Sequence, residues 1–251
     1  AIAWNPKGYL NNSMFRIDPS TASAEDMRRW RAHYYANISL IDEGIGKILA
    51  ALEAHGTLEN TLIIFTSDHG DALGDHGLPF KGYFYESMAH VPMIVRGPHA
   101  PDGQRRATAG GRCASVVSGL DVVATFFDVC GVQAPKTVQG KSLTPLLEDP
   151  MASTHDVVFC EITGRVMVTD GQWKYCHYVT GEAELYDLTV EAPQMEVENL
   201  AGRPEVAQVE SRLRARLLEH WLQNQHTQQM ATSVPQHPFR VALEKAYKQE
   251  R

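Results

Sequence analysis

The sequence predicts an α/β protein in which a partial parallel or mixed sheet, flanked by helices, precedes a small α+β subdomain with an antiparallel sheet. Two observations predict this class. The first half alternates helical and strand-like patterns, whereas 157–190 contains short strand-like runs separated by glycine turns and followed by a helical pattern. We expect residues 1–150 to form the α/β part, 151–225 the subdomain with its packing helix, and 226–251 a tail.

The first regular element is a long helix that begins near Ser23. Residues 1–22 are rich in proline, glycine and asparagine and read as an irregular lead-in. Asp26 follows Ser23 at capping-box spacing, and Gly56 is a typical residue just after a helix end. Between them, apolar side chains recur every three or four residues, as in an amphipathic helix, at Met27, Trp30, Tyr34, Ile38, Ile41, Ile45, Ile48 and Leu52.

Two strands are predicted next. Residues 61–67 form a short apolar run rich in β-branched side chains, which fits a strand buried on both faces of a parallel sheet. A polar, glycine-rich loop covers 68–81, and residues 91–96 read as a second strand of that sheet. A helix is expected over 118–130, with Gly131 as its stop.

The second half has a different pattern. The Asp170-Gly171 pair lies between two apolar runs and predicts a hairpin turn. A helix is expected from Pro204 to Gln223, and the sequence beyond Asn224 lacks a clear pattern. Four strand-like runs precede this helix, at residues 157–162, 166–169, 173–177 and 184–188.

Composition excludes several classes of protein. Of 251 residues, 43% are hydrophobic and 21% charged, as in soluble globular proteins, and the formal net charge of −7 argues against a nucleic-acid partner. No run of 18 apolar residues exists, so no membrane span is expected. The four cysteines form no CxxC pair, and most of them are expected to be free, buried, small apolar residues. Homo-oligomerisation is left open.

The N-terminus carries neither a Met nor a signal-peptide pattern. We therefore expect the chain to be processed, tagged or truncated, and the compartment, whether periplasmic, secreted or cytoplasmic, is not assigned.

The candidate site follows the first strand, where Asp68 and His69 stand side by side. Ligands of open α/β sheets bind at the carboxyl ends of strands, and Gly70 permits a turn there. A carboxylate and a neutral imidazole suit a divalent metal such as Ca²⁺, Mg²⁺ or Mn²⁺. Two ligands are an incomplete site, and a solvated turn is the alternative interpretation.

Other polar residues surround this pair. Lys81 could offset charge on an oxyanion or a leaving group, or it could be an ordinary surface lysine. His76 is expected to organise the loop by hydrogen bonds. Glu86 and His90 could line the same cleft or form a surface pair.

These motifs carry a family resemblance. Residues 61–98, with SDHGD, GDHG, KGYFYE and VPMIVRGP in order, closely resemble the sulfatase family of the alkaline-phosphatase-like superfamily, arylsulfatases included. The order continues with VSGLDVVATFFD at 117–128, QGKSLTPLL at 139–147, and ELYDL at 184–188 before ENL at 198–200. The resemblance implies a partial alkaline-phosphatase-like fold.

The resemblance also implies a function. A member of this family is a sulfuric ester hydrolase that acts on a small-molecule sulfate ester, aryl or carbohydrate, with a divalent metal and a formylglycine nucleophile. Ca²⁺ is the expected metal, with Mg²⁺ and Mn²⁺ as alternatives. Asp68 and His69 would be metal ligands, and Lys81 would be a catalytic and substrate-binding residue that contacts the sulfate group and the leaving oxygen.

The formylglycine motif, C/S-x-P-x-R, is absent from this sequence. Cys113 lies in RCASV, which lacks the proline and the arginine, and the other cysteines do not fit either. We therefore expect a C-terminal portion of a sulfatase that is inactive alone. The alternatives are a phosphodiesterase or phosphonate monoester hydrolase of the same superfamily, or a non-catalytic protein.

Overall fold

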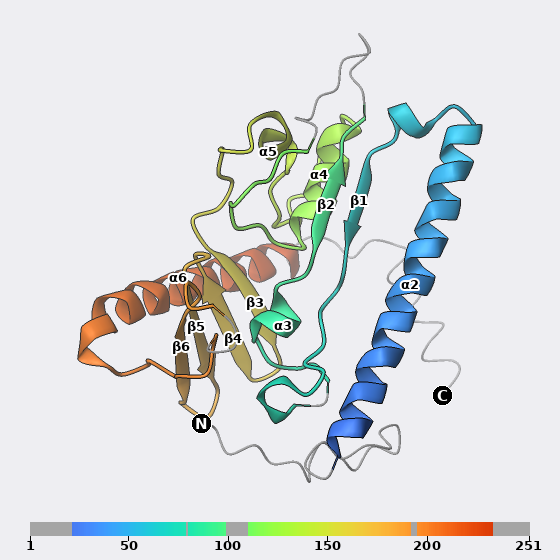
Figure 1. Ribbon diagram of the computed structural model, residues 1–251. Helices are drawn as coiled ribbons and strands as arrows, with labels where there is room; N and C mark the ends of the chain where they lie inside the picture. Colours follow the sequence, from blue (N-terminus) through green and yellow to red (C-terminus); the bar gives the residue numbers. More distant parts are fainter. Residues whose placement is uncertain (1–21, 79, 99–109, 192–194, 233–251) are drawn as a thin grey trace, which may run out of the picture.

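The computed structural model describes residues 22–78, 80–98, 110–191 and 195–232, with side chains up to Asn224. A long helix stands beside a two-stranded ribbon, and a four-stranded sheet with a second long helix across it forms the other end (Figure 1). None of the helices in these ranges is long and apolar enough to cross a bilayer.

The first helix, α2, spans Ala24–Ala54 and confirms the predicted start. The Ser23 hydroxyl accepts a hydrogen bond from the Asp26 backbone at 3.1 Å, and the Asp26 carboxylate accepts one from the Ser23 backbone at 3.0 Å. This reciprocal pair is the capping box. Gly56 has a φ of 67°, which suits the residue after a helix end. A single 3₁₀ turn, η1 (Leu58–Asn60), then leads to the first strand.

The two strands that follow are β1 (Ile63–Thr66) and β2 (Met93–Arg96). They pair antiparallel, so the predicted parallel arrangement is wrong for this pair. The described residues between 67 and 92 contain only the short elements η2 (Asp75–Gly77) and α3 (Glu86–Ala89), and the chain returns at the end of the ribbon that it left. A parallel pair needs a crossover to the opposite end.

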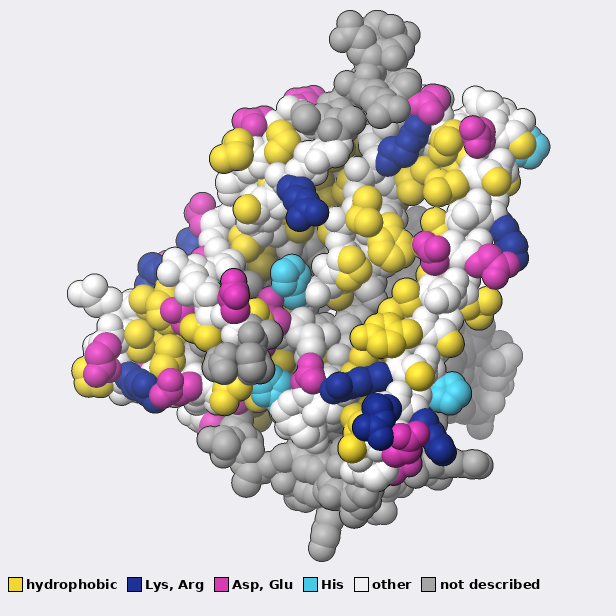
Figure 2. Space-filling view, in the orientation of Figure 1, with side chains coloured by type: hydrophobic (Ala, Val, Ile, Leu, Met, Phe, Trp, Pro, Cys, Tyr) yellow, Lys and Arg dark blue, Asp and Glu magenta, His cyan; other side chains and the backbone are white. Residues whose placement is uncertain are grey.

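The predicted burial of this ribbon on both faces is also not observed among the described residues. Phe65 on β1 and Ile94 on β2 are exposed, and no side chain of α2 is buried. Figure 2 shows apolar side chains along β1, β2 and the facing side of α2. The apolar stripe predicted on α2 therefore exists, but Ile38, Ile41 and Ile48 on it remain exposed. Such a contiguous apolar face is typical of a surface that packs against further polypeptide.

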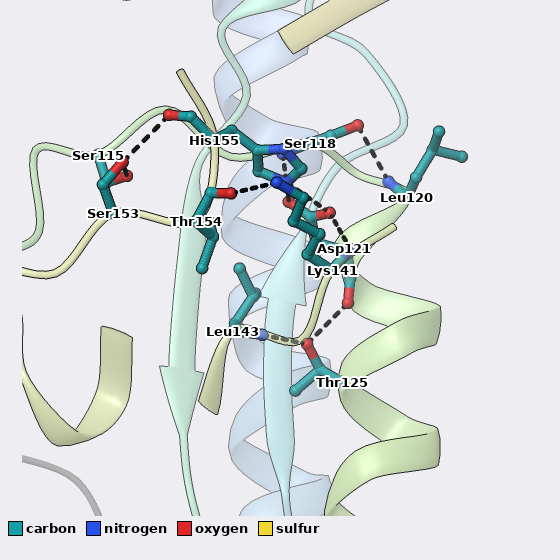
Figure 3. Close-up of polar contacts among 10 residues, drawn as sticks. All are labelled: Ser115, Ser118, Leu120, Asp121, Thr125, Lys141, Leu143, Ser153, Thr154 and His155. Carbon is teal, nitrogen blue, oxygen red and sulfur yellow. Dashed lines mark hydrogen bonds and ion pairs between the residues drawn. The ribbon is translucent and has the colours of Figure 1, made fainter. Parts of the chain in front are cut away.

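Two shorter helices, α4 (Asp121–Val129) and α5 (Thr144–Glu148), are joined to the second half by a buried carboxylate. Asp121 accepts hydrogen bonds from the backbone N–H groups of Ser118 and Lys141, both at 2.8 Å, and His155 Nε2 lies 3.0 Å from both of its oxygens (Figure 3). Because Asp121 ties down Ser118, α4 begins three positions after the predicted start. His155 lies beyond the predicted boundary at residue 150, and that division stays a prediction.

The second half confirms the predicted antiparallel meander. Strands β3 (Val158–Ile162), β4 (Arg165–Thr169), β5 (Trp173–Tyr178) and β6 (Ala183–Asp187) pair in sequential order. The hairpin turn forms at the predicted Asp170-Gly171 pair. There Gly171 has a φ of 89°, and Asp170 Oδ1 accepts backbone hydrogen bonds from Gln172 and Trp173 at 2.9 and 2.7 Å.

The two faces of this sheet have different partners. After the turn η3 (Pro204–Val206), helix α6 (Ala207–Thr232) crosses one face, where Leu213 and Leu217 pack with Val168, Tyr175 and Leu185. The other face packs against α3 and the residues before it, through Phe84, Met167, Cys176 and Tyr178. In Figure 1, α6 passes behind the sheet and α3 lies in front.

The predicted helix end at Gln223 is wrong, because α6 continues to Thr232, into the segment expected to be a tail. Residues 224–232 contain neither glycine nor proline, and nothing in their sequence stops a helix. The rest of the predicted tail lies outside the described residues. The four cysteines are free, but the predicted burial is wrong for Cys113 and Cys130, which are exposed, and holds for Cys176.

Candidate active site

The loop after β1 carries the predicted pair of metal ligands. The Asp68 side chain is 82% exposed, and its Oδ1 accepts a hydrogen bond from the His69 backbone N–H at 3.0 Å. The Ser67 hydroxyl donates to the His69 carbonyl at 2.8 Å. Glycine is required next, because a Cβ on Gly70 would lie 2.0 Å from the Ser87 carbonyl oxygen. Position 70 therefore requires glycine mainly because two backbone segments approach closely there, and less because the chain turns.

The partners of His69 determine its tautomer. Its Nδ1 lies 2.8 Å from the Gly70 carbonyl oxygen, which can only accept, so Nδ1 carries the proton. Its Nε2 contacts the Lys81 Nζ, which can only donate, so Nε2 is the acceptor. Both contacts give the same neutral imidazole with its free lone pair on Nε2. This is a form in which histidine binds metals, and a carbonyl commonly holds the other nitrogen.

The structure brings the three predicted site residues together. Lys81 reaches His69 from the far side of the loop, and the His69 Nε2 lies 3.3 Å from Asp68 Oδ2. Burial would raise the pKa of the Asp68 carboxyl, but the hydrogen bond from the His69 backbone and the charge of Lys81 hold that pKa below its usual value. The site therefore offers a carboxylate, an imidazole lone pair and an ammonium group.

These donors fit a divalent metal only in part. A carboxylate oxygen and an imidazole nitrogen are suitable donors, yet Ca²⁺ takes six to eight ligands. Among the residues that the structure describes, no group of three or more histidine, cysteine, aspartate or glutamate side chains could hold an ion. Asp68 and His69 would therefore supply part of a coordination shell, with the remaining donors coming from elsewhere.

The remaining loop residues have structural contacts. His76 stacks on Tyr85 with ring centroids 3.8 Å apart, so its observed contact in the loop is a ring stack, whereas hydrogen bonds were expected. Asp71 Oδ1 accepts the Leu73 backbone N–H at 2.8 Å, and Asp75 lies 3.4 Å from Arg31 of α2. Trp30 packs edge-on against Phe80, so the N-terminal part of α2 supports the loop from outside.

A buried ionic cluster adjoins the site, and sequence reasoning missed it. Lys174 of β5 is only 1% exposed. Its Nζ donates a hydrogen bond to the Phe84 carbonyl at 2.8 Å and another to Glu196 Oε1 at 2.9 Å. The same Nζ also pairs with Glu86. Glu196 Oε2 accepts the Glu86 backbone N–H at 2.7 Å. One feature of the sequence pointed to this cluster: Lys174 lies on the same face of its strand as Cys176 and Tyr178.

Glu86 also meets His90, whose Nδ1 lies 2.7 Å from Glu86 Oε2. The predicted Glu86–His90 pair thus forms, but Glu86 belongs mainly to the buried cluster. Burial would raise the pKa of Glu86, whereas the hydrogen bond from His90 and the charge of Lys174 lower it to about 2.

Comparison with known proteins shows the family of this chain. A family profile described as "Sulfatase" matches residues 4–132, and one described as "N-sulphoglucosamine sulphohydrolase, C-terminal" matches residues 74–223. A choline-sulfatase of Rhizobium meliloti is 35% identical over 188 residues, which cover 72% of this chain and 35% of that protein. The chain thus spans about a third of the length of that relative.

Solved structures show the same likeness. An enzyme in complex with its substrate D-glucosamine-2-N,6-O-disulfate superposes with a TM-score of 0.70 at 30% identity, covering 80% of this chain and 42% of its own. A phosphonate monoester hydrolase of Agrobacterium radiobacter superposes with a TM-score of 0.68 at 29% identity, covering 81% and 43%. The first profile alone spans more than half of the sequence, and the chain therefore belongs to the sulfatase family.

Proposed function

We propose that this chain, together with further polypeptide, forms a sulfuric ester hydrolase. The observation that carries the proposal is the convergence of Asp68, His69 and Lys81 at the end of β1, in a member of the sulfatase family. The uncovered apolar face of α2, β1 and β2 supports the need for further polypeptide, because such a face packs against protein.

Each of the three residues has a role in this proposal. Asp68 and His69 would hold a divalent metal, Ca²⁺ first and Mg²⁺ or Mn²⁺ as alternatives. When bound, that metal supplies positive charge at the sulfate group, and a formylglycine from outside this sequence supplies the nucleophile. The Gly70 carbonyl keeps the His69 proton on Nδ1. The lone pair of Nε2 would therefore be available to coordinate the metal.

Lys81 acts on the substrate. Its ammonium would donate hydrogen bonds to a sulfate oxygen and to the oxygen of the departing alcohol, where negative charge develops as the S–O bond breaks. Before a metal binds, the contact with His69 holds the lysine beside the metal ligands, close to the place where a sulfate ester would bind.

The proposed substrate is a small-molecule or carbohydrate sulfate ester, aryl sulfates included. The matched choline-sulfatase and the structure bound to D-glucosamine-2-N,6-O-disulfate support this class. A phosphonate monoester hydrolase is the second candidate, because the solved example superposes almost as well, at 0.68 against 0.70.

Substrate competition separates the two functions. The protein expressed from the complete reading frame that contains these residues would be supplied with Ca²⁺ and assayed on 4-nitrophenyl sulfate, choline sulfate, a glucosamine sulfate and phenylphosphonate monoesters. We expect at least one sulfate ester to have a higher kcat/KM than every phosphonate. A higher kcat/KM for a phosphonate would replace the proposal with the second candidate.

A further inference from the structure

The segment that follows Lys81 is held by the C-terminal sheet along its whole length. Arg165, the first residue of β4, donates from Nη1 to the Gly82 carbonyl, and its guanidinium carbon lies 4.7 Å from the centre of the Tyr83 ring. Lys174 holds the Phe84 carbonyl and Glu86. The backbone on the C-terminal side of Lys81 therefore takes its position from a sheet that is distant in sequence.

The backbone on the other side of Lys81 is anchored within the loop. The Phe80 carbonyl accepts a hydrogen bond from the Ala72 N–H at 2.8 Å. Gly82 has a φ of 113°, a conformation that favours glycine, and this turn presents its carbonyl to Arg165. Lys81 is thus the exposed residue between two backbone anchors, and Arg165 provides the second of them.

The Arg165 contact has the features of a precise support. A guanidinium can donate to a carbonyl and stack on an aromatic face at the same time, which an ammonium cannot do equally well. Arg165 also lies 5.8 Å from the ring centre of Tyr178, so it is enclosed by one tyrosine of the loop and one of the sheet. Its orientation is consequently fixed by three groups.

We propose that Arg165 is a positioning residue for Lys81, and that it keeps the Lys81 ammonium in register with His69 by fixing the Gly82 carbonyl. The contribution of this positioning to catalysis rests on the proposed function, but the positioning itself does not. Arg165 contributes no atom to the reacting centre; it acts through the backbone next to the lysine.

Nitrogen NMR of His69 tests this positioning in the 251-residue chain itself. The ¹⁵N shift of His69 Nε2 reports whether this nitrogen accepts a hydrogen bond. His69→Gln assigns the signal, and Lys81→Met defines the shift when the donor is lost. We expect Arg165→Met to move the Nε2 signal most of the way to its position in Lys81→Met.

The control variant is Arg216→Met, which removes an exposed arginine of α6 that pairs with Glu219, and it should leave the His69 signal in place. Arg165→Lys keeps the charge but lacks the planar fork, so we expect an intermediate shift. Thermal melting of each variant shows that the chain is folded. If Arg165→Met does not fold, Arg165→Lys decides the question.

An unmoved His69 signal in a folded Arg165 variant would overturn the proposal, and so would a Lys81→Met variant that leaves the signal unchanged. In the complete enzyme, Arg165→Met should lower kcat by about 10- to 100-fold while KM changes by less than about threefold, because a misplaced group weakens the transition state more than the ground state. Absence of turnover in the wild type would refute the proposed function but leave the NMR result standing.

Discussion

Lys81 donates a hydrogen bond from Nζ to Nε2 of His69, although 12 positions separate the two residues in the chain. The contact depends on the tautomer of His69, which the Gly70 carbonyl sets by accepting from Nδ1 at 2.8 Å. A cation that binds Nε2 must displace the lysine, which would then be free to turn toward a bound sulfate ester. The contact thus joins the two halves of the proposed chemistry, metal binding and leaving-group stabilisation.

The first prediction concerns the metal ligands. In the complete protein, Asp68→Asn and His69→Gln should each weaken Ca²⁺ binding by at least about 100-fold, since even partners of metal ligands contribute 10- to 100-fold. Calorimetric titration of the chelator-treated protein measures this. Asp75→Asn is the matched control, because Asp75 pairs with Arg31 and should keep the affinity of the wild type. Full affinity in either ligand variant contradicts the assignment.

The second prediction concerns the buried cluster. Lys174→Met leaves Glu86 and Glu196 without their buried cation, and Glu196 is itself 2% exposed. Removing one partner of a buried ion pair costs about 3 to 5 kcal/mol of unfolding free energy. Urea unfolding of the 251-residue chain measures the loss. Arg212→Met removes the partner of Asp170, and because the Arg212 side chain is 51% exposed we expect a cost of about 1 kcal/mol or less. Equal losses in the two variants would count against the cluster.

The third prediction concerns acid stability. The pKa of Glu86 is about 2 in the folded chain against 4.5 for the free group. Because the folded value is the lower one, the stabilisation is complete above pH 4.5 and is lost as the pH falls from 4.5 to about 2. At about 1.4 kcal/mol per pKa unit the loss is at most roughly 3 kcal/mol, less some screening because the side chain is 21% exposed.

Chemical unfolding between pH 6 and pH 2 measures this loss. In Glu86→Gln the decline over the acid window should be shallower than in the wild type, whereas Glu59→Gln on an exposed pair with Arg96 should retain it. His90 stays protonated throughout this window and does not change the comparison. A Glu86→Gln profile parallel to that of the wild type would contradict the role given to Glu86.

The fourth prediction concerns the link between the two halves of the chain. Asp121→Ala removes the acceptor for the backbone N–H groups of Ser118 and Lys141 and leaves His155 without its partner (Figure 3). Each unsatisfied buried group costs about 1 to 3 kcal/mol, so we expect a loss of at least about 3 kcal/mol in urea unfolding. Asp149→Ala, at an exposed turn, is the control. A loss no greater than that of the control would refute the role of Asp121.

The elements predicted well are those with local causes. The Ser23–Asp26 capping box and the Asp170-Gly171 hairpin depend on residues within a few positions of each other, and both form. The antiparallel pairing of β1 and β2 was not predicted, because the apolar run of β1 carries no information on the direction of its partner. The end of α6 was missed because weak periodicity does not stop a helix.

The site shows the same division. Asp68 and His69 are adjacent in the sequence, and their chemistry at a strand end pointed to a metal before the order of family motifs joined Lys81 to them. Lys174 lies 88 positions from Glu86 and 22 from Glu196, and only the fold brings them together. Arg165 and Gly82, 83 positions apart, are a further pair of this kind. Long-range polar contacts leave little trace in a single sequence.

The most direct test is the leaving-group dependence of Lys81→Ala in the complete protein. We expect kcat for 4-nitrophenyl sulfate to fall by about 10²-fold or more, and kcat for phenyl sulfate, whose alcohol leaves less readily, to fall further. Lys47→Ala, an exposed lysine on α2, should match the wild type. Equal kcat values for Lys81→Ala and wild type on both esters would show that Lys81 does not act on the leaving oxygen, and would contradict the proposed site.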